Sequence, residues 1–347
     1  MDRNFYLDLA ASGLRMPIAA DLVLHEQEDP EAIARDGAAL GAVIIATAER
    51  FGTPLAFPLM DLRLEKEWLL SGLGVPAEQI DAYHFTSGPG AAELAALPGI
   101  LDGALTPRLT ASLDALRHVA ANSEKVPVGM VIGPYSLATK LLADPITATY
   151  LLAYDPEDPD AQALAAALSL AVGLVERSAA LQVAAGARAV IVCEPAASVQ
   201  FLSPKQLEDV PELLDRAVMD NLRRVRAAIV DGGADFILHD CGELNETLLR
   251  AFATLEPVIL SLGSPVDLPT VTEWIPKSVV LFGNLPSKSF YSDAAITTDG
   301  VRAASEELTA RMAATGHPFI LGSECDVLSV PGHEERIMAK VLALAGR

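Results

Sequence analysis

The residues with the clearest chemical potential form a His-x-Cys pair in the segment LHDCGE, where His239 stands two positions before Cys241. With 6 histidines and 3 cysteines among 347 residues, chance alone predicts about 0.05 such pairs. Two positions apart on an extended segment, both side chains lie on the same face. Both could therefore bind one ion, and the pair predicts a metal centre.

Cys325 is the expected third ligand, because it ends a later apolar run at the same rim of the predicted sheet. One histidine with two cysteines suits zinc, which in catalytic sites keeps a fourth position for water or substrate. Glu194, directly after another apolar run, is the first candidate for a carboxylate at that position and the expected catalytic residue; Glu324 is the second. The alternative for all three ligand residues is ordinary packing in the core or at the rim. For Cys193, inside VIVC, packing is favoured.

The elements that must position these residues are short apolar runs ending at glycine, proline or a polar residue. Eight runs are expected to be strands: 16–23, 54–60, 127–132, 187–193, 235–239, 257–262, 278–282 and 318–322. Helical periodicity marks segments between them, at 159–185, 206–231, 244–253 and 297–315. Apolar strands alternating with amphipathic helices are typical of a parallel sheet covered by helices. Eight such units predict a single (β/α)8 TIM-type barrel.

The segment 61–126 is too long for one crossover and is expected to hold extra helices inserted between strands two and three. No low-complexity linker and no evident repeat divides the chain. Its length also lies within the range of α/β barrels. Residues 1–347 are therefore interpreted as one domain.

Polar residues follow several of the expected strands, and active sites of such barrels lie at the carboxyl ends of the strands. Asp61 and Glu65 follow the second strand, Tyr135 the third and Asn284 the seventh. The Gly-Pro and Gly-Asn steps before Tyr135 and Asn284 are most often turns. The two acids fit a solvated rim or helix-start charges as well as a substrate role.

The composition excludes several classes of partner. A formal net charge of -21 disfavours nucleic acid and anionic membrane surfaces, whose phosphates require a surplus of Lys and Arg. No apolar run approaching the roughly 20 residues of a spanning helix is expected, and MDRNFYLDLA lacks the features of a signal peptide. An odd number of cysteines argues against a disulfide framework. We expect a cytoplasmic protein.

Segments across nearly the whole chain from about residue 30 resemble the uroporphyrinogen decarboxylase superfamily. They are GPYSLATKLL, VIVCEPAAS with LSP at 202–204, LHDCG, LFGNLP, and FILGSECDV followed by VPGHEERIMAKVLAL. Within the superfamily the sequence is most similar to zinc-dependent corrinoid methyltransferases, such as methylcobamide:coenzyme M methyltransferases and related O-demethylase methyltransferases. The diagnostic element of that branch, His-x-Cys and a distant Cys, matches His239, Cys241 and Cys325. The decarboxylase branch carries an RQAGR-type segment near its N-terminus, where this chain has SGLRMPIAAD with Arg15 alone.

The resemblance implies methyl transfer, in one-carbon metabolism, between a corrinoid cobalt and a small molecule: a thiol or tetrahydrofolate as acceptor, or a methyl ether or amine as donor. The implied cofactors are Zn²⁺ and a corrinoid (cobalamin) carried by a partner protein, because the chain has no DxHxxG cobalamin signature. Asp61, Tyr135 and Asn284 are then candidates for the corrinoid-docking surface or the substrate pocket. The alternatives are a decarboxylase of an acidic substrate and a non-enzymatic barrel with a structural zinc. A homodimer through outer helices is one expected assembly.

Overall fold

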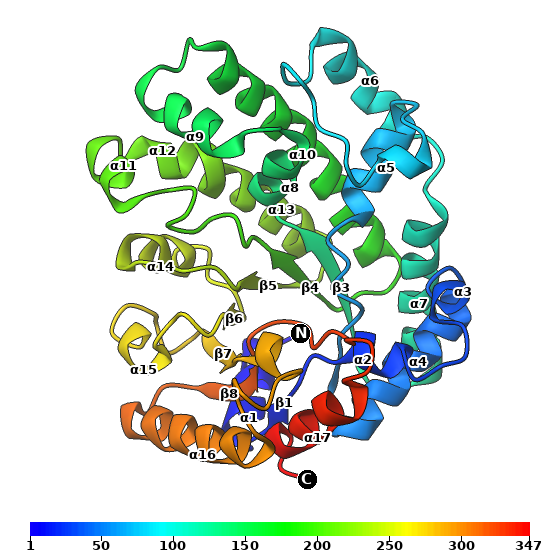
Figure 1. The fold of residues 1–347 in the computed structure, drawn as a ribbon, viewed down its shortest axis with the longest axis vertical. Helices are drawn as coiled ribbons and strands as arrows, with labels where there is room; N and C mark the ends of the chain where they lie inside the picture. The colour runs from blue at the N-terminus through cyan, green and yellow to red at the C-terminus, as the bar shows by residue number, and fades with distance from the viewer.

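The computed structural model describes all residues 1–347 and has a curved sheet of eight parallel strands with helices around it (Figure 1). The strands are β1 (Arg15–Met16), β2 (Leu55–Ala56), β3 (Val126–Ile132), β4 (Ala189–Cys193), β5 (Asp235–Asp240), β6 (Ile259–Leu262), β7 (Val280–Leu285) and β8 (Phe319–Ser323). The sheet order is β1-β8-β7-β6-β5-β4-β3-β2, so the last strand returns to the first and only β1 and β2 lack a ladder between them. The predicted (β/α)8 TIM-type barrel is confirmed.

The α-helices account for most of the remaining chain. They are α1 (Arg3–Ala11), α2 (Ala20–Leu24), α3 (Pro30–Ile33), α4 (Gly37–Phe51), α5 (Leu64–Gly72), α6 (Ala91–Leu101), α7 (Pro107–Asn122), α8 (Pro134–Leu141), α9 (Pro145–Tyr154), α10 (Pro159–Ala184), α11 (Pro204–Asp209), α12 (Glu212–Leu214), α13 (Asp220–Asp231), α14 (Glu246–Ala253), α15 (Leu268–Val271), α16 (Thr298–Thr315) and α17 (Glu334–Leu344). Short helical turns η1 (Ala77–Gln79), η2 (Asp215–Met219) and η3 (Ser287–Ser289) complete the set.

The strands alternate between two buried faces, which explains why they are apolar throughout. One face fills the barrel interior with a separate cluster of side chains, among them Val128, Ile191, Ile237, Val280 and Ile320. The intervening residues pack outward in a cluster of 61 buried residues shared with the covering helices. Cys193 belongs to the interior cluster, in agreement with its expected packing role.

Helix α10 is the central helix of the outer layer and packs against α8, α9 and α13. It is also long and apolar enough to cross a membrane by length and composition, contrary to the expectation that no such segment exists. More than half of its most apolar window, 56%, is buried inside the protein. This burial is what a core helix requires, because its apolar side chains already have protein neighbours.

The insert expected at 61–126 contains α5, η1, α6 and α7, and α5 and α6 lie beside α10 (Figure 1). The expected boundaries of the first two strands were wrong. The run 16–23 forms only the end of β1 before α2 begins at Ala20, and 54–60 pairs only at Leu55–Ala56. Residues such as Ile18 and Phe57 are buried by packing into the barrel interior, not by strand pairing.

Candidate metal centre

His239, Cys241 and Cys325 meet at the carboxyl ends of the strands. One potential ligand atom from each residue lies within 4.8 Å of the other two. His239 is the fifth residue of β5, Cys241 follows that strand directly, and Cys325 lies just after β8. The barrel therefore brings together side chains from two segments that are far apart in the sequence.

The imidazole of His239 is held by a residue on the next strand. In the register of the parallel ladder His239 pairs with Ser261 of β6, and its Nδ1 lies 2.8 Å from Ser261 Oγ. The other ring nitrogen, Nε2, is buried without a hydrogen-bond partner. With Nδ1 protonated and donating to the hydroxyl, Nε2 presents a free lone pair, which is the arrangement of a metal-binding histidine.

A close backbone approach holds Cys241 in place. The Gly263 amide after β6 donates to the Asp240 carbonyl at 3.0 Å. A Cβ at Gly263 would lie 2.6 Å from the Cys241 carbonyl oxygen, so only glycine fits without a shift of the backbone. On the other side, the Gly242 amide donates to Asp240 Oδ1 at 2.7 Å. The position of Cys241 therefore depends on the loop after β6 and on a hydrogen bond within its own loop.

The electrostatics of the cluster favour a thiolate at Cys241. A hydrogen bond from the Cys325 thiol, with further contributions from His239 and Lys288, holds the pKa of Cys241 well below its usual value. The same hydrogen bond and burial raise the pKa of Cys325. Burial opposes the charge of Lys288, but the negative charges of Cys241 and Glu324 outweigh it and raise its pKa.

A cavity of about 530 Å³ opens directly over the cluster. His239, Cys241, Cys325 and Lys288 form part of its wall, and Pro195 follows β4 there. The other lining residues come from the loops after β1, β2 and β8 and from the insert: Asp21, Leu24, His25, Pro30, Glu31, Ala34, Leu59, Met60, Asp61, Leu62, Arg63, Arg108, Asp326 and Leu328. The cavity thus occupies the end of the barrel where enzymes of this architecture have their active sites.

The two candidate carboxylates are engaged elsewhere. Glu194 is fully buried and accepts the backbone amides of Tyr135 and Ser136 at 3.1 and 2.5 Å, at the start of α8. Burial nevertheless raises its pKa to about 7. Glu324 accepts the amide and hydroxyl of Ser264 and the amide of Lys288. Neither belongs to the three-residue cluster, so the structure brings together the predicted ligands but not the predicted fourth one.

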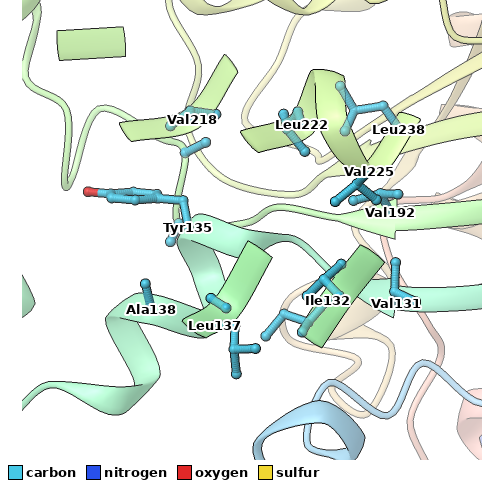
Figure 2. Close-up of a cluster of buried hydrophobic side chains, with 14 of the residues drawn as sticks. Val131, Ile132, Tyr135, Leu137, Ala138, Val192, Val218, Leu222, Val225 and Leu238 are labelled. Atoms are coloured by element: carbon cyan, nitrogen blue, oxygen red, sulfur yellow. The ribbon is translucent and has the colours of Figure 1, made fainter. Parts of the chain in front are cut away.

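The three residues expected at the docking surface have different environments. Asp61 lines the cavity and forms ion pairs with Arg63 and Arg108. The expectation for Tyr135 was wrong: its ring is fully buried near Leu137, Ala138 and Val218 (Figure 2), because the inward face of α8 packs into the core.

The expectation for Asn284 was also wrong. Its side chain is buried and donates to the carbonyls of Gly263 and Val266 at 2.8 and 2.7 Å. It is not part of the cavity wall. Asn284 therefore supports the loop that contacts Cys241 and does not face a ligand.

Sequence reasoning missed three residues of the site. Ser261 orients His239, Lys288 lies beside the sulfurs, and Asp326 lines the cavity. Burial and the neighbouring charge of Asp21 raise the pKa of Asp326 to about 8. Ser261 lies inside the predicted strand 257–262, and Asp326 lies four residues after the predicted strand 318–322, so both are close to strand ends, but only the structure shows their roles. Lys288 lies further along its loop and has no such signal.

The comparisons with known proteins agree with this architecture. The family model described as "Uroporphyrinogen decarboxylase (URO-D)" matches residues 25–342. No curated protein sequence matches the chain. Among solved structures, a methyltransferase from Methanosarcina mazei is similar with a TM-score of 0.70 and 18% sequence identity, covering 99% of this chain and 98% of that one. At this identity the likeness shows a shared fold.

Proposed function

The chain belongs to the uroporphyrinogen decarboxylase (URO-D) family, and on that premise we propose that it is a zinc-dependent methyltransferase acting between a corrinoid protein and a small molecule. The observation that carries the proposal is the meeting of His239, Cys241 and Cys325 in the wall of the cavity. The similar fold of a methyltransferase supports it. Arg63 and Arg108, the arginines of the cavity, are paired with Asp61, so no free arginine cluster favours decarboxylation of an acidic substrate.

The residues present fit a zinc ion. His239 offers a buried nitrogen that lacks a hydrogen-bond partner, and the two cysteines offer sulfur ligands. Nitrogen and sulfur donors in a set of three leave a fourth position for a substrate, as in catalytic zinc sites. When bound, zinc keeps a sulfur ligand ionised at neutral pH and polarises a heteroatom as a Lewis acid.

The protein residues position the reactants. Ser261 fixes the orientation of the His239 ring, and Gly263 fixes the approach of Cys241. The cavity is large enough for a small molecule and has both apolar and charged walls. Leu328 is 59% exposed at its rim, and we propose that the corrinoid protein docks over this opening.

Metal analysis of alanine variants tests the site. We expect about one zinc per chain in the purified protein and loss of most of it in Cys241→Ala and Cys325→Ala. Cys193→Ala is the matched control, because Cys193 is buried in the interior cluster and lies outside the proposed ligand set. Full zinc content in both ligand variants would refute the site.

A methyl-transfer assay tests the activity. The zinc-loaded protein is mixed with methylcobalamin and a small thiol, and demethylation of the corrinoid is followed by absorbance. We expect turnover by the wild type and by Cys193→Ala, and loss of turnover in Cys241→Ala. Turnover that is independent of zinc would contradict the proposal.

A further inference from the structure

Cys241 and Cys325 bring two free thiols together in the wall of the cavity. Their sulfurs belong to the cluster whose ligand atoms all lie within 4.8 Å of one another. A disulfide bond has a sulfur–sulfur length of about 2.05 Å, so the two sulfurs need to approach each other by less than about 3 Å to become bonded. Rotation of the two side chains and small movements of their loops can supply this approach.

The cavity gives small molecules access to this pair of sulfurs. Cys241 and Cys325 are half-buried, and both line the cavity of about 530 Å³. Partly exposed cysteines can be oxidised, whereas cysteines enclosed in the core are inert. A small neutral peroxide can therefore reach either sulfur from the cavity.

The third cysteine of the chain lies apart from the pair. Cys193 ends β4, is fully buried in the barrel interior and does not line the cavity. Its register partner on β5 is His239, but its sulfur is outside the cluster of ligand atoms. Cys325 is therefore the partner that the structure offers to Cys241.

Oxidation of the pair requires one two-electron oxidant, and a peroxide meets that requirement. The peroxide transfers one oxygen to the first sulfur, which becomes a sulfenic acid. The second thiol then attacks that sulfur, forms the disulfide and releases the oxygen as water. With hydrogen peroxide the balance is two thiols and one peroxide giving one disulfide and two water molecules.

The disulfide would remove two of the three proposed metal ligands. Zinc binds cysteine as the thiolate, and the sulfurs of a disulfide carry no such charge. Of the cluster only His239 would remain, with its buried Nε2 that lacks a hydrogen-bond partner. One nitrogen ligand is not enough for a zinc ion, which catalytic sites hold with three protein ligands.

We propose that Cys241 and Cys325 form a reversible oxidation site, in which a peroxide joins the two sulfurs as a disulfide and releases the metal ion. This inference rests on the proposed function and describes regulation of the same site by the redox state of its ligands. Methyl transfer stops while the disulfide is present, and it resumes after a thiol reductant and zinc have restored the site. Disulfides of this kind are transient in a reducing compartment.

Treatment of the zinc-loaded protein with hydrogen peroxide tests the proposal. We expect the free thiols, counted in the denatured protein, to fall from three to one per chain, with release of about one zinc ion to a chelating indicator. Peptide mapping without reductant should find Cys241 and Cys325 in linked peptides. Dithiothreitol followed by zinc should restore both thiols and the bound metal.

Cysteine variants identify the bond. Cys193→Ala is the matched variant and should form the same disulfide, because Cys193 lies outside the cluster. Cys325→Ala should keep its two remaining thiols free. Three thiols that stay free in the treated wild type, a disulfide that joins Cys193 to Cys241, or thiols that dithiothreitol does not restore would overturn the inference.

The same mapping on zinc-free protein separates this inference from the proposed function. A disulfide between Cys241 and Cys325 in a protein that never binds zinc would contradict the proposed function and leave the oxidation of the pair in place. Bound zinc that peroxide does not release, without any disulfide, would contradict the inference and leave the metal site in place.

Discussion

The hydrogen bond between His239 and Ser261 determines which nitrogen of the imidazole is available to bind a metal ion. The ladder pairs the two residues, so their side chains project on the same side of the sheet. The bond at 2.8 Å occupies Nδ1 and leaves Nε2 without a partner. Residues that bond the second nitrogen of a histidine ligand fix its tautomer and orientation. Ser261 is therefore a positioning residue of the metal centre.

Removal of the Ser261 hydroxyl should weaken zinc binding without abolishing it. For Ser261→Ala we expect the zinc dissociation constant to rise by about 10- to 100-fold, as for other partners of metal ligands. Competition with a chelating indicator measures the change. Ser178→Ala is a matched control, since Ser178 is also buried and donates to the buried Glu65, away from the cluster. Equal zinc affinity in the wild type and Ser261→Ala would argue against the positioning role.

The ligands could be predicted from the sequence because cysteines are rare in it and His-x-Cys is an unusual pair. Ser261 could not be chosen in advance, because its role depends on the register between β5 and β6. The place of Lys288 beside the sulfurs could not be predicted either, because it depends on how the loops after β7 and β8 pack together. Tyr135 was predicted wrongly. Its position after a strand could be identified in the sequence, but that position does not determine which face of the next helix points into the core.

At the scale of elements, the loops after β5, β6 and β7 support one another. Gly263 lies against Cys241, and the Asn284 side chain holds the carbonyl of Gly263 from the β7 side. The first of these contacts requires the absence of a Cβ. The loop after β6 therefore affects the metal site although it provides no ligand.

Gly263→Ala should displace Cys241. The added Cβ would meet the Cys241 backbone at 2.6–2.8 Å, and backbone cannot move aside as cheaply as a flexible side chain. We expect zinc affinity to fall by about tenfold or more, a loss comparable with that of a supporting residue. Calorimetric zinc titration measures it. Gly99→Ala is the control, because a Cβ there meets no atom within 4 Å, and similar losses in both variants would contradict the explanation.

The elements differ in how well the sequence predicts them. Strands β3 to β8 are buried on both faces, so their apolar runs end close to the strand ends. Around β1 and β2 the apolar runs continue past the paired residues, and Ile18 and Phe57 fill the barrel interior without a ladder. Apolar character reports burial, and it predicts strand length only where burial and pairing coincide.

At the scale of the whole molecule, the buried carboxyl group of Glu65 joins the insert to the outer helix α10. It also makes the stability of the fold depend on pH. Glu65 belongs to α5, and its Oε1 accepts the Ser178 hydroxyl of α10 at 2.8 Å. Its other oxygen is buried without a partner. Burial raises its pKa to about 7 from a usual 4.5. Ionisation of this group is therefore unfavourable in the folded protein.

The stability of the metal-free protein should consequently fall as pH rises from about 5 to 8. In this window folded Glu65 holds a proton that the unfolded chain has lost, so the free energy of unfolding decreases until both forms are ionised. One group with this shift contributes on the order of 3 kcal/mol. Urea unfolding with a chelator at several pH values measures the slope.

Glu65→Gln should make that slope shallower, whatever its effect on absolute stability, because the side chain no longer ionises. Part of the slope should remain, since burial also raises the pKa of Glu194 to about 7. Glu78→Gln, an exposed position in η1 of the same insert, is the control and should keep the wild-type slope. A slope in Glu65→Gln equal to that of the control would show that Glu65 is not protonated in the folded protein, and would remove the link between α5, α10 and the pH dependence.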